Sequence, residues 1–321
     1  MSDYPFYRRV YKLVPKNVLA KADGFKQSVK HKLPQELLKF NLNKYMNSYR
    51  IIMDKWADNE ELNSLTDYFT EKQRVKCAFG KRSKTPYEYW KESKSLIRHK
   101  CMQKYGIINN LLLRETIYSD VRLCNNFRIT VALSILHMFK PKRWLDMSAG
   151  WGDRLLAAIL YGVDFYCGFD PNTSLHPCYS EMIDTFVLEG ERGNFKLYAT
   201  GFESNDEPVG ETFDLVFSSP PFYNLETYSQ SKGDSLVKFT TEQKWIDGFL
   251  LPSLIKAYNK LEKGGHLVLY YQGNAAQKKA LHTLDKWMQY KGNIYFYDTT
   301  PREFYVWKKT RPTSHHIASL T

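Results

Sequence analysis

Several features are scarce or absent in this sequence, and each absence excludes a class of protein. No apolar run approaches the roughly 18 residues of a membrane-spanning helix, so no membrane partner is expected. The first residues contain no apolar segment of the kind found in a signal peptide. The 5 cysteines show no CxxC spacing, which indicates neither a zinc site nor a disulfide framework, and no metal is expected. We therefore expect a soluble intracellular protein, cytoplasmic or nuclear.

Positive charge is concentrated in one part of the chain. Residues 1–100 carry 22 Lys and Arg against 11 Asp and Glu, whereas the other 221 residues carry 24 against 23. The same hundred residues contain 15 aromatic side chains. Basic residues interleaved with aromatics favour contact with a nucleic acid, because cations neutralise phosphates and rings stack on bases. A solvated basic surface over an aromatic helical core is the alternative.

The N-terminal part shows helical patterns. From Pro34 an apolar stripe with steps of three and four predicts one face of a helix. Its members are Leu38, Leu42, Tyr45, Tyr49, Ile52 and Trp56. Thr85-Pro-Tyr-Glu88 has the form of a capping box and predicts the start of another helix. Residues 101–125 are interpreted as a junction. We expect residues 1–120 to form a basic, mainly helical N-terminal domain.

Strand and helix patterns alternate from residue 127 onwards. Strands are predicted at 143–146, 164–169, 195–200, 213–218, 266–271, 293–298 and 303–308. Helices are predicted at 127–139, 151–161, 174–188, 241–261, with a break or restart at Pro252, and 274–290. Such alternation predicts an α/β fold with a mostly parallel sheet between helices. The last two strands are joined by a short turn and should be antiparallel. Residues 121–310 would form this domain, and residues 311–321 a C-terminal tail.

Polar or glycine-rich stretches follow the predicted strands, at the sheet edge where α/β proteins bind ligands. The first strand ends in Asp146, and a turn with Gly150 and Gly152 leads into a helix. Glycines allow close backbone approach to a ligand, and a helix start offers free N–H groups. The second strand ends at Asp170, 24 residues after Asp146, where a carboxylate suits two ribose hydroxyls.

The fourth strand ends in Ser218-Ser219-Pro220-Pro221-Phe222. Two prolines constrain the backbone and direct a carbonyl outward, while the aromatic residue supplies a flat face for a ring. Together they suit an enzyme that holds a planar exocyclic amine. A dinucleotide-dependent enzyme has no need of such a loop.

Residues 126–308 resemble a class I S-adenosylmethionine-dependent methyltransferase. The stretch Asp146-x-Ser-Ala-Gly150-x-Gly152 is similar to the family's first motif, and Ser219-Pro-Pro-Phe222 to the (Asp/Asn/Ser)-Pro-Pro-aromatic motif of its amino-methyltransferases. The resemblance implies a Rossmann-like seven-stranded sheet of order 3-2-1-4-5-7-6, with strand seven antiparallel. It also implies S-adenosyl-L-methionine as cofactor and direct transfer of its methyl group to an amino nitrogen.

The resemblance assigns roles to individual residues. Asp146, Gly150 and Gly152 would surround the methionine part of the cofactor, and Asp170 would hold the ribose. Phe202 and Glu203 would contact the adenine. The full cofactor-binding set is Asn126, Asp146, Ser148, Ala149, Gly150, Gly152, Asp170, Phe202 and Glu203. Ser219, Pro220, Pro221 and Phe222 form the catalytic set that would clamp the target base.

Several substrates fit this reading. Ser219 favours cytosine N4, because the related adenine-modifying enzymes usually have Asp or Asn there, yet adenine N6 stays open. Cytosine C5 chemistry is excluded, since residues 219–229 contain no Cys that could act as its nucleophile. DNA is the favoured polymer. RNA, including an mRNA cap adenine, a protein glutamine, and a catalytically silent nucleic-acid-binding subunit are the alternatives.

Overall fold

The computed structural model describes residues 3–5, 40–43, 48–53, 63–80, 83–204, 207–208, 210–223, 225–228, 233–296 and 302–312. Most of the predicted C-terminal tail lies outside these ranges. None of the helices in the described ranges has both the length and the apolar character needed to cross a membrane.

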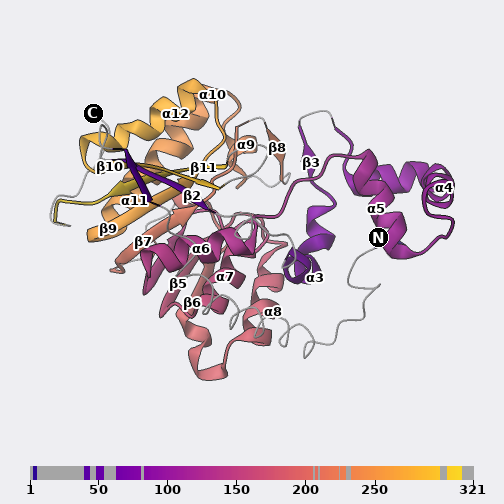
Figure 1. Ribbon diagram of the computed structural model, residues 1–321, viewed down its shortest axis with the longest axis horizontal. Helices are drawn as coiled ribbons and strands as arrows, with labels where there is room; N and C mark the ends of the chain where they lie inside the picture. Colours follow the sequence, from indigo (N-terminus) through magenta and orange to yellow (C-terminus); the bar gives the residue numbers. More distant parts are fainter. Residues whose placement is uncertain are drawn as a thin grey trace.

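A nine-stranded sheet forms the centre of the protein, in the order β1-β2-β10-β11-β9-β7-β4-β5-β6 (Figure 1). The strands are β1 Phe40–Asn43, β2 Ser48–Met53, β4 Arg143–Asp146, β5 Phe165–Phe169, β6 Phe195–Tyr198, β7 Phe213–Ser218, β9 Leu261–Tyr270, β10 Gln289–Phe296 and β11 Arg302–Lys308. Strands β6, β5, β4, β7 and β9 are parallel, and β11 is antiparallel to both of its neighbours. Counted from β4, the seven strands β4–β7 and β9–β11 have the predicted order 3-2-1-4-5-7-6. The predicted Rossmann-like order of seven strands, with the last one antiparallel, is confirmed within this larger sheet.

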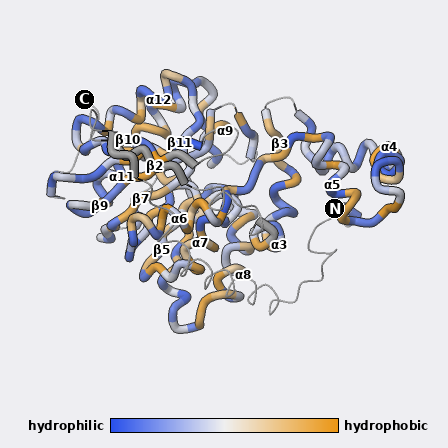
Figure 2. Tube along the Cα trace, viewed as in Figure 1, coloured by the Kyte–Doolittle hydropathy of each residue, from blue (hydrophilic) through white to orange (hydrophobic). Residues whose placement is uncertain are grey.

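Helices cover both faces of this sheet. They are α6 Ile129–Phe139, α7 Asp153–Tyr161, α8 His176–Phe186, α9 Ser235–Lys238, α10 Glu242–Trp245, α11 Leu251–Lys260 and α12 Ala275–Leu281. Alternate residues of each strand point to opposite layers: Trp144 belongs to the core that includes α6, α7 and α8, and Leu145 to the core that includes α11 and α12. Hydrophobic colouring in Figure 2 accordingly follows β7, α6 and α7. The result is a three-layer fold with a separate core on each face of the sheet.

Most predicted boundaries in this part of the chain are confirmed to within a few residues. The predicted helix at 241–261 divides into α10, a π-helical turn at Ile246–Leu250 and α11, with Pro252 in the first turn of α11 as expected. The predicted helix at 274–290 is too long. It ends at Leu281 and a 3-10 turn follows at His282–Lys286, because β10 already begins at Gln289 to pair with Lys308.

The helix predicted from the stripe at residues 38–56 is wrong. The segments Phe40–Asn43 and Ser48–Met53 form an antiparallel pair, and Ile51–Met53 runs parallel to Ile294–Phe296 at the edge of the sheet. Aromatic and β-branched residues favour strands, and β10 offers an open row of N–H and C=O groups. These two strands come from the segment assigned to the N-terminal domain, so its predicted boundary near residue 120 does not separate them from the sheet.

The remaining N-terminal residues are helical. Helix α3 Asn63–Arg74 lies against α7 and α8. Helices α4 Pro86–Tyr105 and α5 Asn110–Asp120 pair with each other and project away from the sheet (Figure 1). The capping box at Thr85 and Glu88 is confirmed at the start of α4. Residues 101–125 are not a simple junction, because they contain the end of α4 and all of α5. A small core between α4 and α5 includes Trp90, Ile97 and Leu113.

Candidate functional site

The glycine turn after β4 is tied to the neighbouring strand and helix. Gly150 and Gly152 have φ angles of 61° and 94°, a left-handed backbone that favours glycine. The N–H of Ala149 donates to the Phe169 carbonyl at 2.7 Å. The Tyr179 hydroxyl of α8 donates to the Gly150 carbonyl. The turn therefore has one defined shape at the carboxyl edge of the sheet.

Asp146 is fully buried under this turn. Its carboxylate accepts hydrogen bonds from Arg154 Nε at 2.8 Å and from the Tyr166 hydroxyl at 3.0 Å. The Ser218 hydroxyl donates to it at 2.7 Å and the Ser148 N–H at 3.2 Å. Four donors satisfy a buried carboxylate, so Asp146 joins β4, β7 and α7 together below the turn.

Asp170 lies at the end of β5 and faces the glycine turn. One carboxylate oxygen accepts from the Gly150 N–H at 3.0 Å and the other from the Asn172 N–H at 2.9 Å. Burial raises the pKa of Asp170 to about 7, although both hydrogen bonds act to lower it. A ligand that brings hydroxyl donors or a positive charge would stabilise the ionised form.

Glu203 has an unsatisfied acceptor. Its Oε1 accepts from the Ser204 hydroxyl at 2.7 Å and from Lys238 Nζ at 3.2 Å, whereas its buried Oε2 has no hydrogen-bond partner among the described residues. Phe202, beside it, is buried against Phe169, with ring centroids 5.0 Å apart. A buried carboxylate oxygen without a donor costs free energy, so this position is suited to a ligand that supplies one.

The Ser219–Phe222 segment follows β7 directly. The Phe222 ring is held edge-on by Tyr270 and Tyr271, with centroids at 5.7 and 5.5 Å. These contacts from the end of β9 give the ring one orientation. Ser219 and Pro221 are half-buried and line the same space as the glycine turn.

A cavity of about 300 Å³ lies where these strand ends meet. The predicted site residues that line it are Asn126, Ser148, Gly150, Asp170, Phe202, Glu203, Ser219, Pro221 and Phe222. Four others do not line it: Asp146, Ala149, Gly152 and Pro220. The arrangement therefore gives no support to a direct ligand contact by Asp146, which instead holds Arg154 and the turn in place.

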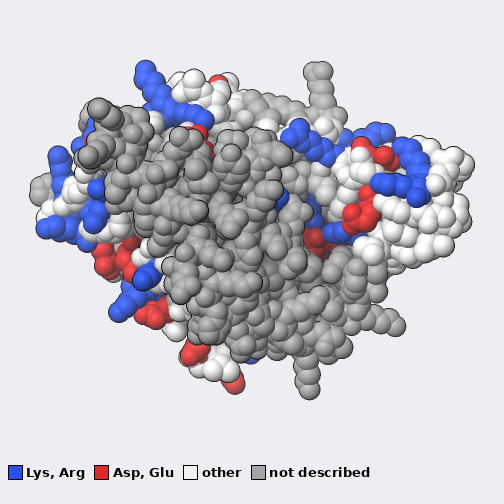
Figure 3. All heavy atoms as spheres, viewed as in Figure 1, with Lys and Arg blue, Asp and Glu red and all other residues white. Residues whose placement is uncertain are grey.

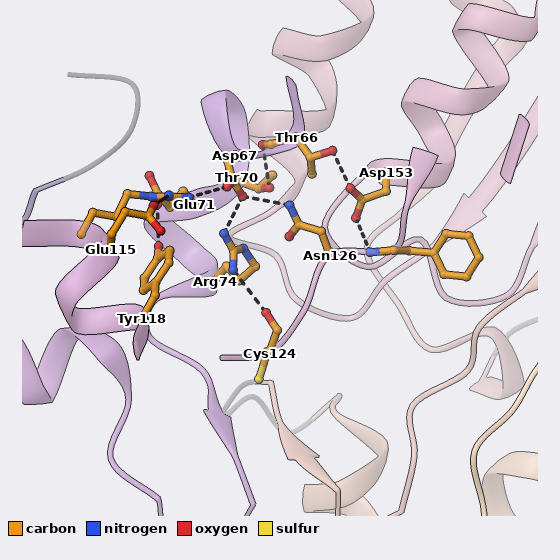
Figure 4. A network of polar contacts seen from close by, with 12 residues as sticks. Thr66, Asp67, Thr70, Glu71, Arg74, Glu115, Tyr118, Cys124, Asn126 and Asp153 are labelled. Carbon is orange, nitrogen blue, oxygen red and sulfur yellow. Dashed lines mark hydrogen bonds and ion pairs between the residues drawn. The ribbon is translucent and has the colours of Figure 1, made fainter. Parts of the chain in front are cut away.

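The N-terminal helices hold two of the lining residues (Figure 4). The Asn126 amide donates to Asp67 of α3 at 2.9 Å. The Asp153 carboxylate accepts from the Thr66 hydroxyl at 2.6 Å and from the Phe127 N–H at 3.1 Å. Burial raises the pKa of Asp153 to about 7. The cavity is therefore supported from α3 as well as from the sheet.

Several lining residues were not predicted from the sequence. They include Phe79, Arg122, Trp151, Asp153, Arg154, Glu226, Tyr228, Asp234, Tyr270 and Arg302. Glu226 and Tyr228 follow the proline motif closely, and that nearness is a usable signal. Nothing local marks Phe79, because it reaches the cavity through a strand pairing with residues far along the chain. Arg122 lies over the Phe79 ring and has no local signal either.

The charge around the cavity is mixed, with a predominance of carboxylates. The acidic side chains are Asp153, Asp170, Glu203, Glu226 and Asp234, and the basic ones are Arg122, Arg154 and Arg302. Arg154 is already paired with Asp146. Within the described ranges, no group of three or more His, Cys, Asp or Glu side chains is placed to hold a metal ion.

No protein-family model matches the sequence, and no curated protein matches it either. Solved structures do match. TrmN from Thermus thermophilus is 15% identical with a TM-score of 0.41, over 56% of this chain and 48% of TrmN, so the match spans about half of that protein. An rRNA methylase from Streptococcus thermophilus is 15% identical with a TM-score of 0.39, over 58% of this chain and 98% of that one. The N-methyltransferase NodS from Bradyrhizobium japonicum, in complex with S-adenosyl-L-homocysteine, is 11% identical with a TM-score of 0.39, over 56% and 86%. At these identities the likeness concerns the fold alone.

Proposed function

We propose that this protein is an S-adenosylmethionine-dependent methyltransferase that modifies an exocyclic amino nitrogen of a nucleic-acid base, with DNA as the favoured polymer. One observation carries the proposal. The cavity brings the carboxylates of Asp170 and Glu203 together with Ser219 and Phe222, from three different strand ends. The residues that would bind the cofactor and the residues that would clamp the amine therefore line the same cavity.

The lining residues fit the cofactor chemically. Asp170 would accept hydrogen bonds from ribose hydroxyls, and the unsatisfied Glu203 oxygen would accept one from the adenosine part. The carboxylates of Asp170 and Glu203 suit a ligand that brings hydrogen-bond donors and a positive charge better than a pyrophosphate, which supports this cofactor over a dinucleotide. When bound, it supplies a methyl group on a positively charged sulfur. Ser148 and Gly150 also line the cavity, and we propose that they hold its amino-acid part.

Ser219 and Phe222 support the amine substrate. The loop's hydroxyl and carbonyls can accept hydrogen bonds from an NH2 group, while Phe222 presents a ring whose orientation is already set. A base that is paired in a duplex would have to leave the stack to reach this depth. We favour cytosine N4 on the evidence of Ser219, with adenine N6 as the second choice.

Exposed basic residues support a nucleic-acid partner. Lys91, Arg98 and Lys104 are exposed along α4, the helix that projects from the protein. Figure 3 shows Lys and Arg side chains, with Asp and Glu among them, at this α4–α5 end. Such a surface would contribute phosphate contacts that position a strand without selecting its sequence.

The deciding experiment is transfer of a labelled methyl group onto mixed DNA and RNA, followed by mass spectrometry of the nucleosides. We expect label on N4-methylcytosine or N6-methyladenine from DNA. The matched variant Ser219→Ala with Phe222→Ala should lose transfer and retain thermal stabilisation by the cofactor. If label is found in RNA alone, the substrate is RNA and not DNA.

Two results would overturn the proposal at different levels. If a large excess of S-adenosylmethionine does not raise Tm, the protein is not this kind of enzyme. If the cofactor binds and no nucleic acid is methylated, the proposed function is wrong and the protein is a catalytically silent nucleic-acid-binding subunit.

A further inference from the structure

The N-terminal part contributes a short strand that reaches the cavity. Strand β3, Ala78–Phe79, pairs antiparallel with β8, Glu226–Thr227, and Phe79 lies opposite Glu226. Strand β8 follows the proline motif by only a few residues. Phe79 and Phe222 both line the cavity, although more than a hundred residues separate them in the sequence. The pairing thus places a second aromatic side chain beside the amine-clamping loop.

A planar cation already lies on the ring of Phe79. The guanidinium carbon of Arg122 is 3.6 Å from the ring centroid, which is stacking distance. Arg122 lines the cavity and is also exposed to solvent, so it stands at the mouth. The face of Phe79 therefore accommodates a flat group. Because Arg122 is exposed, its guanidinium can move outward from the ring.

Glu226 lies opposite Phe79, and the positive charge of Arg122 partly compensates the burial of its carboxylate. The Tyr228 hydroxyl donates to its carboxylate. Burial raises the pKa of Glu226, and the charge of Arg122 acts in the opposite direction. A carboxylate at this place can accept a hydrogen bond from an amino group at the edge of a base.

Buried contacts hold the chain next to Phe79 and next to Arg122 in place, and leave the Arg122 side chain exposed. Arg74 at the end of α3 pairs with Asp67 at 2.5 Å and donates to the Cys124 carbonyl at 3.3 Å (Figure 4). Cys124 follows Arg122 by two residues in the sequence. The Cys77 thiol, two residues before Phe79, donates to the Tyr228 carbonyl at 2.7 Å. The end of α3, the segment around Arg122 and the loop after β8 are therefore joined to one another.

We propose that Phe79 and Arg122 form the target-nucleotide side of the cavity. The base stacks on Phe79 in the place that the guanidinium occupies here, and Arg122 turns outward to contact a phosphate of the same strand. This inference rests on the proposed function and extends it, since it makes the N-terminal helical part a component of the substrate site. Aromatic stacking accepts any base, whereas Glu226 favours one that presents an amino group.

The test measures binding of a fluorescein-labelled single-stranded DNA oligonucleotide by anisotropy, without cofactor. We expect Phe79→Leu, which keeps apolar bulk and loses the aromatic face, to weaken binding about 10-fold, and Phe79→Tyr to bind like wild type. Arg122→Gln should weaken binding several-fold and reduce the salt dependence of the affinity. The control Lys263→Gln removes one exposed positive charge near the start of β9, whereas the cavity lies at the end of β9 with Tyr270. This variant should change neither the affinity nor its salt dependence.

A second readout separates the failure of this inference from the failure of the proposed function. Tm with and without S-adenosylmethionine is measured for each variant, and methyl transfer onto the same oligonucleotide is measured for wild type. If wild type binds cofactor and transfers methyl groups while Phe79→Leu and Arg122→Gln bind the oligonucleotide as wild type does, the inference is wrong and the function stands. If wild type neither binds nor methylates this oligonucleotide, both the inference and the proposed DNA substrate are wrong. Arg122→Gln keeps the test decisive should Phe79→Leu fold poorly, because Arg122 is exposed.

Discussion

The Thr66 hydroxyl in α3 donates a 2.6 Å hydrogen bond to the Asp153 carboxylate at the start of α7. Both residues are buried, and the other oxygen of Asp153 accepts from the Phe127 N–H at 3.1 Å. One carboxylate therefore joins an N-terminal helix, the segment before α6 and the helix that follows the glycine turn. Asp153 also lines the cavity, so this contact couples the N-terminal part to the candidate site.

We predict that Thr66→Val destabilises the protein more than Thr66→Ser does. Valine has nearly the same shape and no hydroxyl, so it leaves a buried carboxylate oxygen without its donor, at a cost of about 1–3 kcal/mol. Serine keeps the donor. Urea unfolding at pH 8 gives both free energies of unfolding. Equal losses for the two variants would mean that the hydrogen bond contributes little.

The contribution of Asp153 to stability should fall as the pH rises from about 4 to 7. The pKa of Asp153 is raised from 3.8 to about 7 in the folded protein, so between these values the folded state binds more protons than the unfolded state. Stability decreases with pH wherever that holds. Asp153→Asn has no such titration and should show a flatter dependence over the same window, since its amide can still accept from Phe127 and donate to Thr66. Urea unfolding at several pH values compares the two proteins. Parallel curves would contradict the raised pKa.

Glu203→Gln should weaken S-adenosylmethionine binding about 10-fold, because a charged acceptor contributes more to a hydrogen bond than a neutral one. The unsatisfied Oε2 is the atom concerned. Isothermal titration calorimetry measures the affinity. The control is Glu189→Gln, an exposed position that does not line the cavity. An unchanged affinity in Glu203→Gln would remove Glu203 from the cofactor site.

Gly152→Ala should cost more stability than Gly162→Ala. Both glycines have positive φ, 94° and 80°, where an alanine is strained by about 1–3 kcal/mol. A Cβ at Gly152 would also lie 2.7 Å from Met182 Cε, whereas nothing lies within 4 Å of one at Gly162. Thermal unfolding of the two variants isolates the steric part. Equal shifts in Tm would show that Met182 moves aside without cost.

The strands of the Rossmann-like sheet could be predicted largely from local patterns, whereas their order came from the family resemblance. Strand β4 was predicted at Arg143–Asp146 and β7 at 213–218, with the bounds that the structure has. Buried parallel strands carry continuous apolar runs, and glycine and proline mark their ends, so each signal lies within a few residues. The same locality explains why Asp170, Glu203 and Phe222 could be singled out as lining residues of one site.

Other features depend on contacts between distant segments. The 38–56 stripe fitted a helix, but edge pairing with β10 gives strands, because hydrogen-bond partners on another strand do not appear in a local pattern. Asp146 stood out in the sequence as a ligand contact, but four surrounding donors make it a buried anchor. Phe79 and Arg122 carried no local signal at all.

The amino-acid sequence by itself determined where most strands of the α/β part end and which kinds of side chain follow them, because a strand, its turn and the motif after it are formed by neighbouring residues. Only the tertiary structure decided which of those residues face the cavity and that α3, β3 and the segment around Arg122 complete it. The physical reason is that burial, and the pairing of β3 with β8, depend on segments brought together by folding.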